Sequence, residues 1–504
     1  MTETSPLAAV QESSETSTGT GVPRPSMAEQ ARIAEILAGP RGAQIGAFFD
    51  FDSTVVAGYS VTEFLNARLR RLAAEPARLR QLVSTVGVAG FLRPASVAGR
   101  NTNNDELRAV YELALSAWAG RSEEELDSMG ARAMAERLNC QVWRLIQAHH
   151  HMGHTVALVS SAPRCQLAAL ARELEVEHLL CTELEIKDGT FTGRLAGDPL
   201  LRGADKAEAA AAFATAHTID LSRSHGYAGT RDDLAFLRTV ARPCVISPNG
   251  ATTRAAATAR WPVLPLDRRP PRPSTVARSL LAWGSLAPML TTGAGVNVAA
   301  GRGARVSGLE LALASRTYMR IAGVRLRVEG EEHLWSRRPA VFIINHQSPL
   351  DVTIAIQLAE HGVTFVAKDS IQRVPGLTRV TDLVYVDRSS TRAALRMFTD
   401  AVDRLRRGTS VIIAPEGTRS LTPSPGTFKK GAFLIAKRAG VPVVPIIIHN
   451  SAQLMPRSAM TTAAGEVRVT VAPPIDVSGW KVSELDQRIT AVRDLYLATL
   501  TGYR

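Results

Sequence analysis

The sequence has few cysteines and few aromatic residues: four cysteines in 504 residues, and 5% Phe, Trp and Tyr together. No two cysteines form a CxxC pair, so the chain shows no zinc-site pattern. Unpaired thiols without a disulfide framework are typical of a reducing cytoplasm. The cysteines are Cys140, Cys165, Cys181 and Cys244.

The first residues also lack the pattern of a signal peptide. Residues 1–26 are rich in Ser, Thr, Glu, Gly and Pro and contain neither a basic n-region nor an apolar h-region. We expect a disordered tail there and no export. The remainder, with 45% hydrophobic residues over the whole chain, is long enough for two or three domains.

The chain carries more basic than acidic residues: it has 59 Lys and Arg and 47 Asp and Glu, which gives a net charge of +12. Such an excess suits nucleic acid, an anionic membrane or phosphorylated substrates. No nucleic-acid motif accompanies it, so we expect no nucleic-acid partner and favour membrane lipids. Several arginines crowd a Pro-rich linker at residues 266–275, and this linker separates two halves with different motifs.

In the first half, the apolar run 46–49 ends in two carboxylates at alternate positions, Asp50 and Asp52, followed by Ser53 and Thr54. This run resembles the DxDxT motif of the haloacid dehalogenase superfamily, close to its phosphoserine-phosphatase-like branch. The resemblance covers roughly residues 44–250. It implies a Rossmann-like core in which Asp50 attacks phosphorus and Asp52 donates and later accepts a proton.

Further runs follow in the order of that family. Ser160, after an apolar strand pattern, is expected to donate a hydrogen bond to the phosphoryl group, and Lys206 to neutralise its charge. The resemblance also implies Mg²⁺, with Asp50, Asp52 and Asp233 as its ligands.

The acidic motif near Asp233 departs from the family, because Gly229 stands where the family places its first metal-binding aspartate. The sequence therefore predicts a weakened Mg²⁺ site, which Gly229→Asp should restore. Residues 55–60 contain no acid, so free phosphoserine is not the expected substrate. Residues 58–148, rich in Ala, Leu and Arg, resemble the helical cap of this branch, within a domain of residues 27–265.

In the second half, His346 and Asp351 are separated by four residues, after the apolar run 340–344 and at the start of a helical pattern. A histidine of near-neutral pKa can remove the proton of an attacking alcohol, while a carboxylate holds its tautomer. A second apolar strand, residues 410–414, leads into the run Pro415-Glu416-Gly417-Thr418-Arg419.

These runs resemble the HxxxxD and PEGTR blocks of the glycerolipid acyltransferases, over roughly residues 320–480. The resemblance implies an α/β domain at residues 326–504 and direct attack by the acceptor hydroxyl on an acyl thioester. It makes the PEGTR block and Arg388, in a third block, the predicted contacts to the acceptor phosphate. The predicted substrate-binding residues of this block are Glu416, Gly417, Thr418 and Arg419.

Between the halves, residues 279–301 carry no charged side chain, although Pro and Gly dilute the leucines. Their length is enough to span a bilayer. A full crossing would place the two predicted active sites on opposite sides of the membrane, whereas acyl-CoA, acyl carrier protein and unpaired thiols belong to the cytoplasm. We therefore favour an interfacial or re-entrant segment within a membrane-associating region, 276–325. The amphipathic run 309–324 either lies among headgroups or is an ordinary docking helix.

The sequence thus predicts a bifunctional protein of the actinobacterial type, with a haloacid dehalogenase-like hydrolase fused to a 1-acylglycerol-3-phosphate acyltransferase. We expect it on the cytoplasmic face of the membrane. Acyl-CoA or acyl carrier protein would supply the acyl group and lysophosphatidic acid would accept it, without a cofactor. Two alternatives stay open: another lysophospholipid acceptor, and a catalytically impaired, regulatory first domain.

Overall fold

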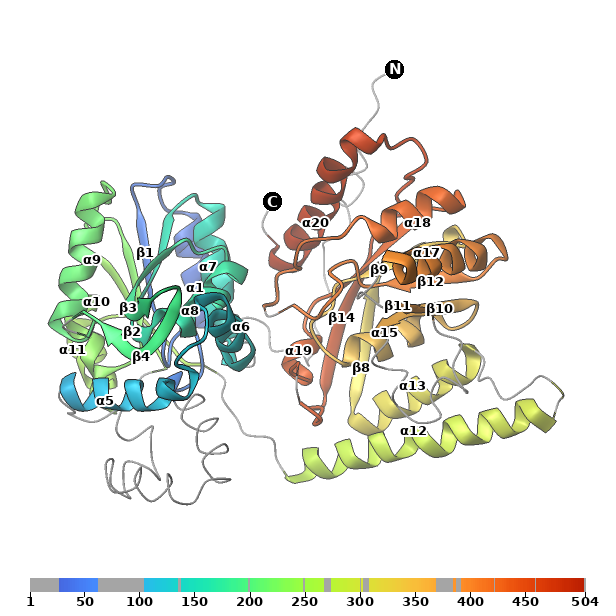
Figure 1. The fold of residues 1–504 in the computed structure, drawn as a ribbon, viewed down its shortest axis with the longest axis horizontal. Helices are drawn as coiled ribbons and strands as arrows, with labels where there is room; N and C mark the ends of the chain where they lie inside the picture. Colours follow the sequence, from blue (N-terminus) through green and yellow to red (C-terminus); the bar gives the residue numbers. More distant parts are fainter. Residues whose placement is uncertain are drawn as a thin grey trace.

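Two seven-stranded sheets, one in each half of the chain, form the framework of the computed structural model (Figure 1). The predicted α/β class is confirmed for both halves. The structure describes residues 27–61, 104–134, 137–197, 200–247, 250–266, 273–299, 301, 308–368, 384–386, 391–420, 422–457 and 459–502. The predicted tail, much of the predicted cap, most of the linker and Arg388 lie outside these residues.

The first sheet has the strand order β4-β3-β2-β1-β5-β6-β7 and is parallel except for the β3–β4 hairpin. On the central strand, Phe48 and Phe49 point to opposite faces and join separate hydrophobic clusters, as the two-residue period of a strand requires. Both faces are therefore covered. The strands are β1 Gly46–Asp50, β2 Thr155–Pro163, β3 His178–Lys187, β4 Thr190–Ala196, β5 His225–Ala228, β6 Arg242–Ile246 and β7 Val263–Leu264.

Helices cover this sheet on both sides (Figure 1). α7, Cys140–His151, packs beside α1, Met27–Leu37, and against β2 of the sheet. The predicted cap, residues 58–148, included the first nine residues of this helix. The helices are α1 Met27–Leu37, α5 Asn104–Leu115, α6 Glu123–Met134, α7 Cys140–His151, α8 Arg164–Glu173, α9 Ala204–Ala216, α10 Leu234–Leu237 and α11 Gly250–Ala259, with 3-10 turns at Ser116–Trp118 and Arg231–Asp233. The four cysteines are free, as expected.

The second sheet has the order β11-β10-β12-β9-β13-β14-β8, with only the β13–β14 pair antiparallel among the described strands. On β9, Phe342 and Ile344 join one hydrophobic cluster, and Val341 and Ile343 join the other. The strands are β8 Val324–Glu329, β9 Val341–Ile344, β10 Val363–Lys368, β11 Val384–Val386, β12 Ser410–Ile413, β13 Val443–Ile448 and β14 Gly465–Val471.

The helices of the second half begin with a long one. α12, Pro273–Ala299, starts with a proline in its first turn, where the missing N–H costs nothing, and packs along α13, Gly308–Ala322. The others are α14 His333–Ser336, α15 Leu350–Ala359, α17 Thr391–Arg406, α18 Gly431–Ala439, α19 Ser451–Leu454 and α20 Leu485–Thr501, with a 3-10 turn at Val482–Glu484.

α12 and α13 lie at one edge of the second half (Figure 1). α13 packs against α15 and β8, so it docks on the domain, yet Leu309 and Leu313 on it are exposed. In the part of the chain that the structure describes, no helix combines the length and apolarity that a membrane crossing needs.

Candidate functional sites

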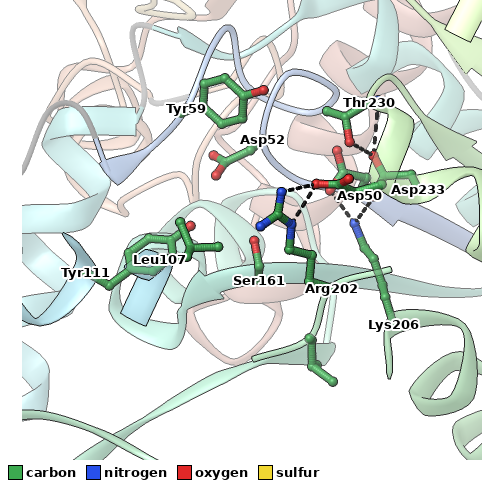
Figure 2. A pocket seen from close by; sticks show the side chains of 12 residues that line it. Asp50, Asp52, Tyr59, Leu107, Tyr111, Ser161, Arg202, Lys206, Thr230 and Asp233 are labelled. Atoms are coloured by element: carbon green, nitrogen blue, oxygen red, sulfur yellow. Dashed lines mark hydrogen bonds and ion pairs between the residues drawn. The ribbon is translucent and has the colours of Figure 1, made fainter. Parts of the chain in front are cut away.

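Three charged side chains meet at the carboxyl edge of the first sheet. Asp50 is the last residue of β1, Lys206 lies in the first turn of α9, and Asp233 follows β5. Nζ of Lys206 donates to Oδ1 of Asp50 and to Oδ1 of Asp233, at 2.6 Å each (Figure 2). The structure thus brings together residues predicted from three separate runs of sequence.

The surroundings of these groups shift their pKa values. Burial raises the pKa of Asp50 to about 7, helped by Asp233 and opposed by Lys206. Burial also raises the pKa of Asp52 to about 6, although its Oδ1 accepts a 2.7 Å hydrogen bond from the amide of Ser60. Burial lowers the pKa of Lys206, but Asp233 and Asp50 outweigh it and raise that pKa above its ordinary value. Lys206 therefore stays charged.

The pocket around Asp50 and Asp52 is lined by Ser161 instead of the predicted Ser160 (Figure 2). Ser160 is buried, and its Oγ accepts a hydrogen bond from the amide of Ala162. Neighbouring residues of a strand face opposite ways, so the choice between two adjacent serines depends on the register of β2, which the sequence leaves open. The wall also includes residues that sequence reasoning missed: Tyr59, Leu107, Tyr111, Arg202 and Thr230.

Asp50, Asp52 and Asp233 line the same pocket, so their charge suits a divalent cation, but among the described residues these carboxylates do not form a group whose ligand atoms all lie within 4.8 Å of one another. Each oxygen of Asp233 is already engaged, however, because Oδ2 accepts from the amide and the hydroxyl of Thr230, at 3.1 and 2.6 Å. Gly229 contributes no side chain. A Cβ built there would lie 2.5 Å from the carbonyl oxygen of Ile246, closer than real Cβ contacts come. The backbone at this position therefore opposes the expectation that Gly229→Asp simply restores a ligand.

The second site forms where β9 ends and α15 begins. Nδ1 of His346 lies 3.1 Å from Oδ2 of Asp351, which also accepts from the amides of Gln347 and Ser348, both at 2.7 Å. Asp351 is fully buried, whereas the side chain of His346 is 21% exposed. A buried carboxylate with these donors fixes Nδ1 as the protonated ring nitrogen, so Nε2 is the free base.

Glu416 braces the backbone of this site and does not face an open surface. Its Oε1 accepts from the amide of His346 and its Oε2 from the amide of Gly426, at 2.8 Å each. Burial raises the pKa of Glu416 to about 7. In the structure its oxygens are thus engaged by the chain itself, a different arrangement from the predicted contact with substrate.

The residues that follow Glu416 in the PEGTR block differ in conformation and exposure. Gly417 has a φ of 76°, a left-handed conformation that glycine adopts without strain. Thr418 is exposed, and Arg419 is half-buried with its guanidinium donating to the carbonyl oxygen of Arg457. The amide of Ser420 donates to the carbonyl oxygen of His346 at 2.7 Å, which ties this block to the histidine.

Polar residues outside the predicted blocks complete the second site. The side chain of Asn345 exchanges two 2.8 Å hydrogen bonds with the backbone of Ile448 on β13, which fixes the end of β9. The hydroxyl of Ser451 donates to Oδ1 of Asp351. Asn345 stands beside His346 in the sequence and could have been suspected; Ser451 lies 100 residues from Asp351, and only the fold brings it there.

Family models match both halves of the chain. A haloacid dehalogenase-like hydrolase model matches residues 47–238, and an acyltransferase model matches residues 325–449.

Curated relatives match each half in the same way. Phosphoserine phosphatase SerB1 of Mycobacterium tuberculosis is 32% identical over 224 residues, 43% of this chain and 69% of that protein. A 1-acyl-sn-glycerol-3-phosphate acyltransferase of Limnanthes douglasii is 30% identical over 184 residues, 36% of this chain and 65% of that relative. The chain thus spans slightly less than two thirds of the acyltransferase relative.

Solved structures also resemble each half. The 1-acyl-sn-glycerophosphate acyltransferase of Thermotoga maritima has a TM-score of 0.38 and 24% identity, covering 46% of this chain and 98% of that one. A substrate-bound phosphoserine phosphatase has a TM-score of 0.31 and 17% identity, covering 42% of this chain and 89% of the other.

Proposed function

Because the chain belongs to the haloacid dehalogenase-like hydrolases through its first half and joins that domain to an acyltransferase domain, we propose that it makes phosphatidic acid. The second half would transfer an acyl group from acyl-CoA or acyl carrier protein to lysophosphatidic acid. The observation that carries the proposal is the contact between His346 and Asp351, which leaves Nε2 of the histidine available as a base.

In the proposed reaction, Nε2 of His346 removes the proton from the acceptor hydroxyl while the oxygen attacks the thioester carbonyl. Asp351 stabilises the imidazolium that forms. The new C–O bond then replaces the C–S bond, and the departing thiolate takes a proton from His346. No covalent acyl-enzyme is formed. Arg419, with the backbone around Gly417, would hold the acceptor phosphate.

The proposed acceptor is a lipid, and α12 with α13 offers a surface for the headgroup layer on the cytoplasmic face of the membrane. Large apolar side chains there are exposed to solvent and lie on two neighbouring helices. They are Leu280, Leu281, Val296, Val298, Leu309 and Leu313. Burying such side chains among lipids is favourable, by roughly 1.5–3 kcal/mol for a complete transfer of each.

For the first half we propose a phosphomonoesterase reaction. Asp50 would attack phosphorus to give an aspartyl phosphate, and Asp52 would protonate the leaving oxygen and then deprotonate water. Lys206 neutralises charge on the transferring group. Asp50, Asp52 and Asp233 are the residues that would hold Mg²⁺, which supplies positive charge to a reaction on a phosphate anion.

One observation favours the alternative of an impaired, regulatory first domain. Gly229 removes a carboxylate from the metal site, and the close carbonyl oxygen of Ile246 leaves no room for one. Hydrolysis of an aryl phosphate by the purified chain, measured with and without Mg²⁺, distinguishes the two hypotheses. Mg²⁺-dependent turnover supports an active phosphomonoesterase, and no turnover supports an impaired, regulatory domain.

The acyltransferase proposal is tested by supplying purified protein with acyl-CoA or acylated carrier protein and a panel of lysophospholipids. We expect the highest kcat/KM with lysophosphatidic acid. Faster acylation of another lysophospholipid would support the alternative acceptor, and no transfer to any acceptor would refute the proposal.

A further inference from the structure

A tryptophan of the first domain is hydrogen-bonded to the second domain. Trp143 on α7 donates from Nε1 to Oγ of Ser424 at 3.0 Å. The two residues are only 3% and 6% exposed. A buried N–H that lost this partner would remain without a hydrogen bond, so the contact is costly to break.

Ser424 belongs to a loop, residues 422–426, that supports the acyltransferase site. The carbonyl oxygen of Pro423 in this loop accepts a 2.7 Å hydrogen bond from Nε2 of Gln347, the residue after His346. The amide of Gly426 donates to Glu416, whose other oxygen accepts from the amide of His346. The loop therefore braces the backbone of His346 along two routes.

A second contact from the first domain reaches the same loop through Arg493 on α20. Nε of Arg493 donates to the carbonyl oxygen of Pro425 at 3.0 Å, and Nη2 donates to Oε1 of Glu175 at 2.9 Å. Glu175 follows α8 of the first domain, and its side chain is 52% exposed. The acidic residue thus orients a guanidinium that also holds the loop.

The electrostatics at the end of α8 agree with this arrangement. Burial raises the pKa of Glu173, while Arg457, Arg172 and Arg493 lower it. Two of these arginines, Arg457 and Arg493, belong to the second domain. Acidic groups on the first domain therefore face basic groups on the second, which favours one docked orientation.

We propose that the hydrolase-like domain holds the loop of residues 422–426 in place, and through it positions His346 for acyl transfer. The inference rests on the proposed acyltransferase function. Trp143 and Glu175 act as positioning residues, since they contact the loop and its arginine and not the catalytic histidine. The first domain is then required for full acyltransferase turnover, whether or not it hydrolyses a phosphate ester.

The test uses the full chain with conservative substitutions. Trp143→Phe keeps an aromatic side chain, although a smaller one, and removes the N–H, and it should lower kcat for acyl transfer on the order of fivefold, the usual effect of losing one neutral hydrogen bond. Glu175→Gln, at a half-exposed ion pair, should lower it about twofold. Trp261→Phe and Glu177→Gln are matched controls in the same domain, and both should keep the wild-type kcat.

A double substitution shows whether the effect passes through the loop. Trp143→Phe combined with Ser424→Ala should lower kcat no further than the larger single effect, because both remove the same bond. Additive effects, or wild-type kcat in both Trp143→Phe and Glu175→Gln, would overturn the proposal. Because Glu175 lies at the surface, its variant tests the idea even where Trp143→Phe folds poorly.

Amide hydrogen exchange tests the positioning role without depending on acyl transfer. The amides of His346 and Gly426 should exchange faster in Trp143→Phe than in wild type or Trp261→Phe, again on the order of fivefold. If wild type transfers no acyl group, the proposed reaction fails while the exchange rates still decide the positioning. Equal exchange in all three proteins would overturn the positioning role.

Discussion

Oδ2 of Asp351 lies 3.1 Å from Nδ1 of His346. Asp351 is in the first turn of α15, the helix that begins four residues after His346. The carboxylate is fully buried yet accepts several hydrogen bonds, so it remains a strong acceptor for the ring N–H. Because Nδ1 is engaged by this carboxylate and the side chain of His346 is 21% exposed, Nε2 is the ring nitrogen left for a substrate hydroxyl.

Removal of the base should abolish acyl transfer. His346→Ala is expected to lower kcat/KM by about 10² to 10⁴, the usual contribution of a positioned general base, without unfolding the domain. Steady-state rates with lysophosphatidic acid measure the effect. His361→Ala, at an exposed histidine of the same domain, is the control and should leave the rate unchanged. Retention of half the wild-type activity by His346→Ala would refute the assignment.

Arg419 should bind the acceptor in the ground state and the transition state alike. Arg419→Ala is therefore expected to raise the acceptor KM by about tenfold or more while kcat changes little, because it removes uniform binding. Varying each substrate in turn separates the two KM values. A raised KM for acyl-CoA with an unchanged acceptor KM would show that the two substrates were assigned to the wrong sites.

Buried carboxylates make the stability of the first domain depend on pH. The pKa values of Asp50 and Asp52 are raised from 3.8 to about 7 and about 6, first by burial. The folded state then binds more protons than the unfolded state across this window, so the free energy of unfolding should fall as pH rises from about 4 to 7.

Calorimetry of wild type and Asp52→Asn across this pH range measures the effect. The amide oxygen can still accept from Ser60, so Asp52→Asn should fold and show a flatter profile. Asp188→Asn, in the exposed turn after β3, should keep the wild-type profile. A profile of Asp52→Asn as steep as that of wild type would contradict the role of burial.

The sequence was sufficient for the strands and helices that carry the blocks, because one apolar run of four residues ends directly at Asp50 and another, of five residues, ends two positions before His346. It also predicted that Lys206 and Asp233 would join Asp50. It could not predict contacts that depend on packing between distant segments, such as Ser451 with Asp351 or Trp143 with Ser424. Nor does a local pattern reveal whether Glu416 faces substrate or its own backbone.

Membrane association should depend on the exposed leucines of α12. Leu280 and Leu281 are 69% and 64% exposed, and Leu395 on α17 is exposed to the same degree, 63%. Replacing both α12 leucines with serine should weaken binding to anionic vesicles by about tenfold or more, since apolar burial is lost. Leu395→Ser should bind as wild type does in the same sedimentation assay. Complete release of the wild type by high salt would show instead that arginines alone attach it.

Gly229 limits any attempt to restore the metal site. A Cβ at this position would lie 2.5 Å from the carbonyl oxygen of Ile246 at the end of β6, so Gly229→Ala and Gly229→Asp should each destabilise the domain by about 1–3 kcal/mol. Gly250→Ala, where a Cβ meets open space, should unfold as wild type does. We therefore expect Gly229→Asp to lower the melting temperature without tightening Mg²⁺ binding, as measured by calorimetry and titration. A variant that bound Mg²⁺ more tightly at unchanged stability would show that the end of β6 moves readily. The missing aspartate would then be the only obstacle to a complete site.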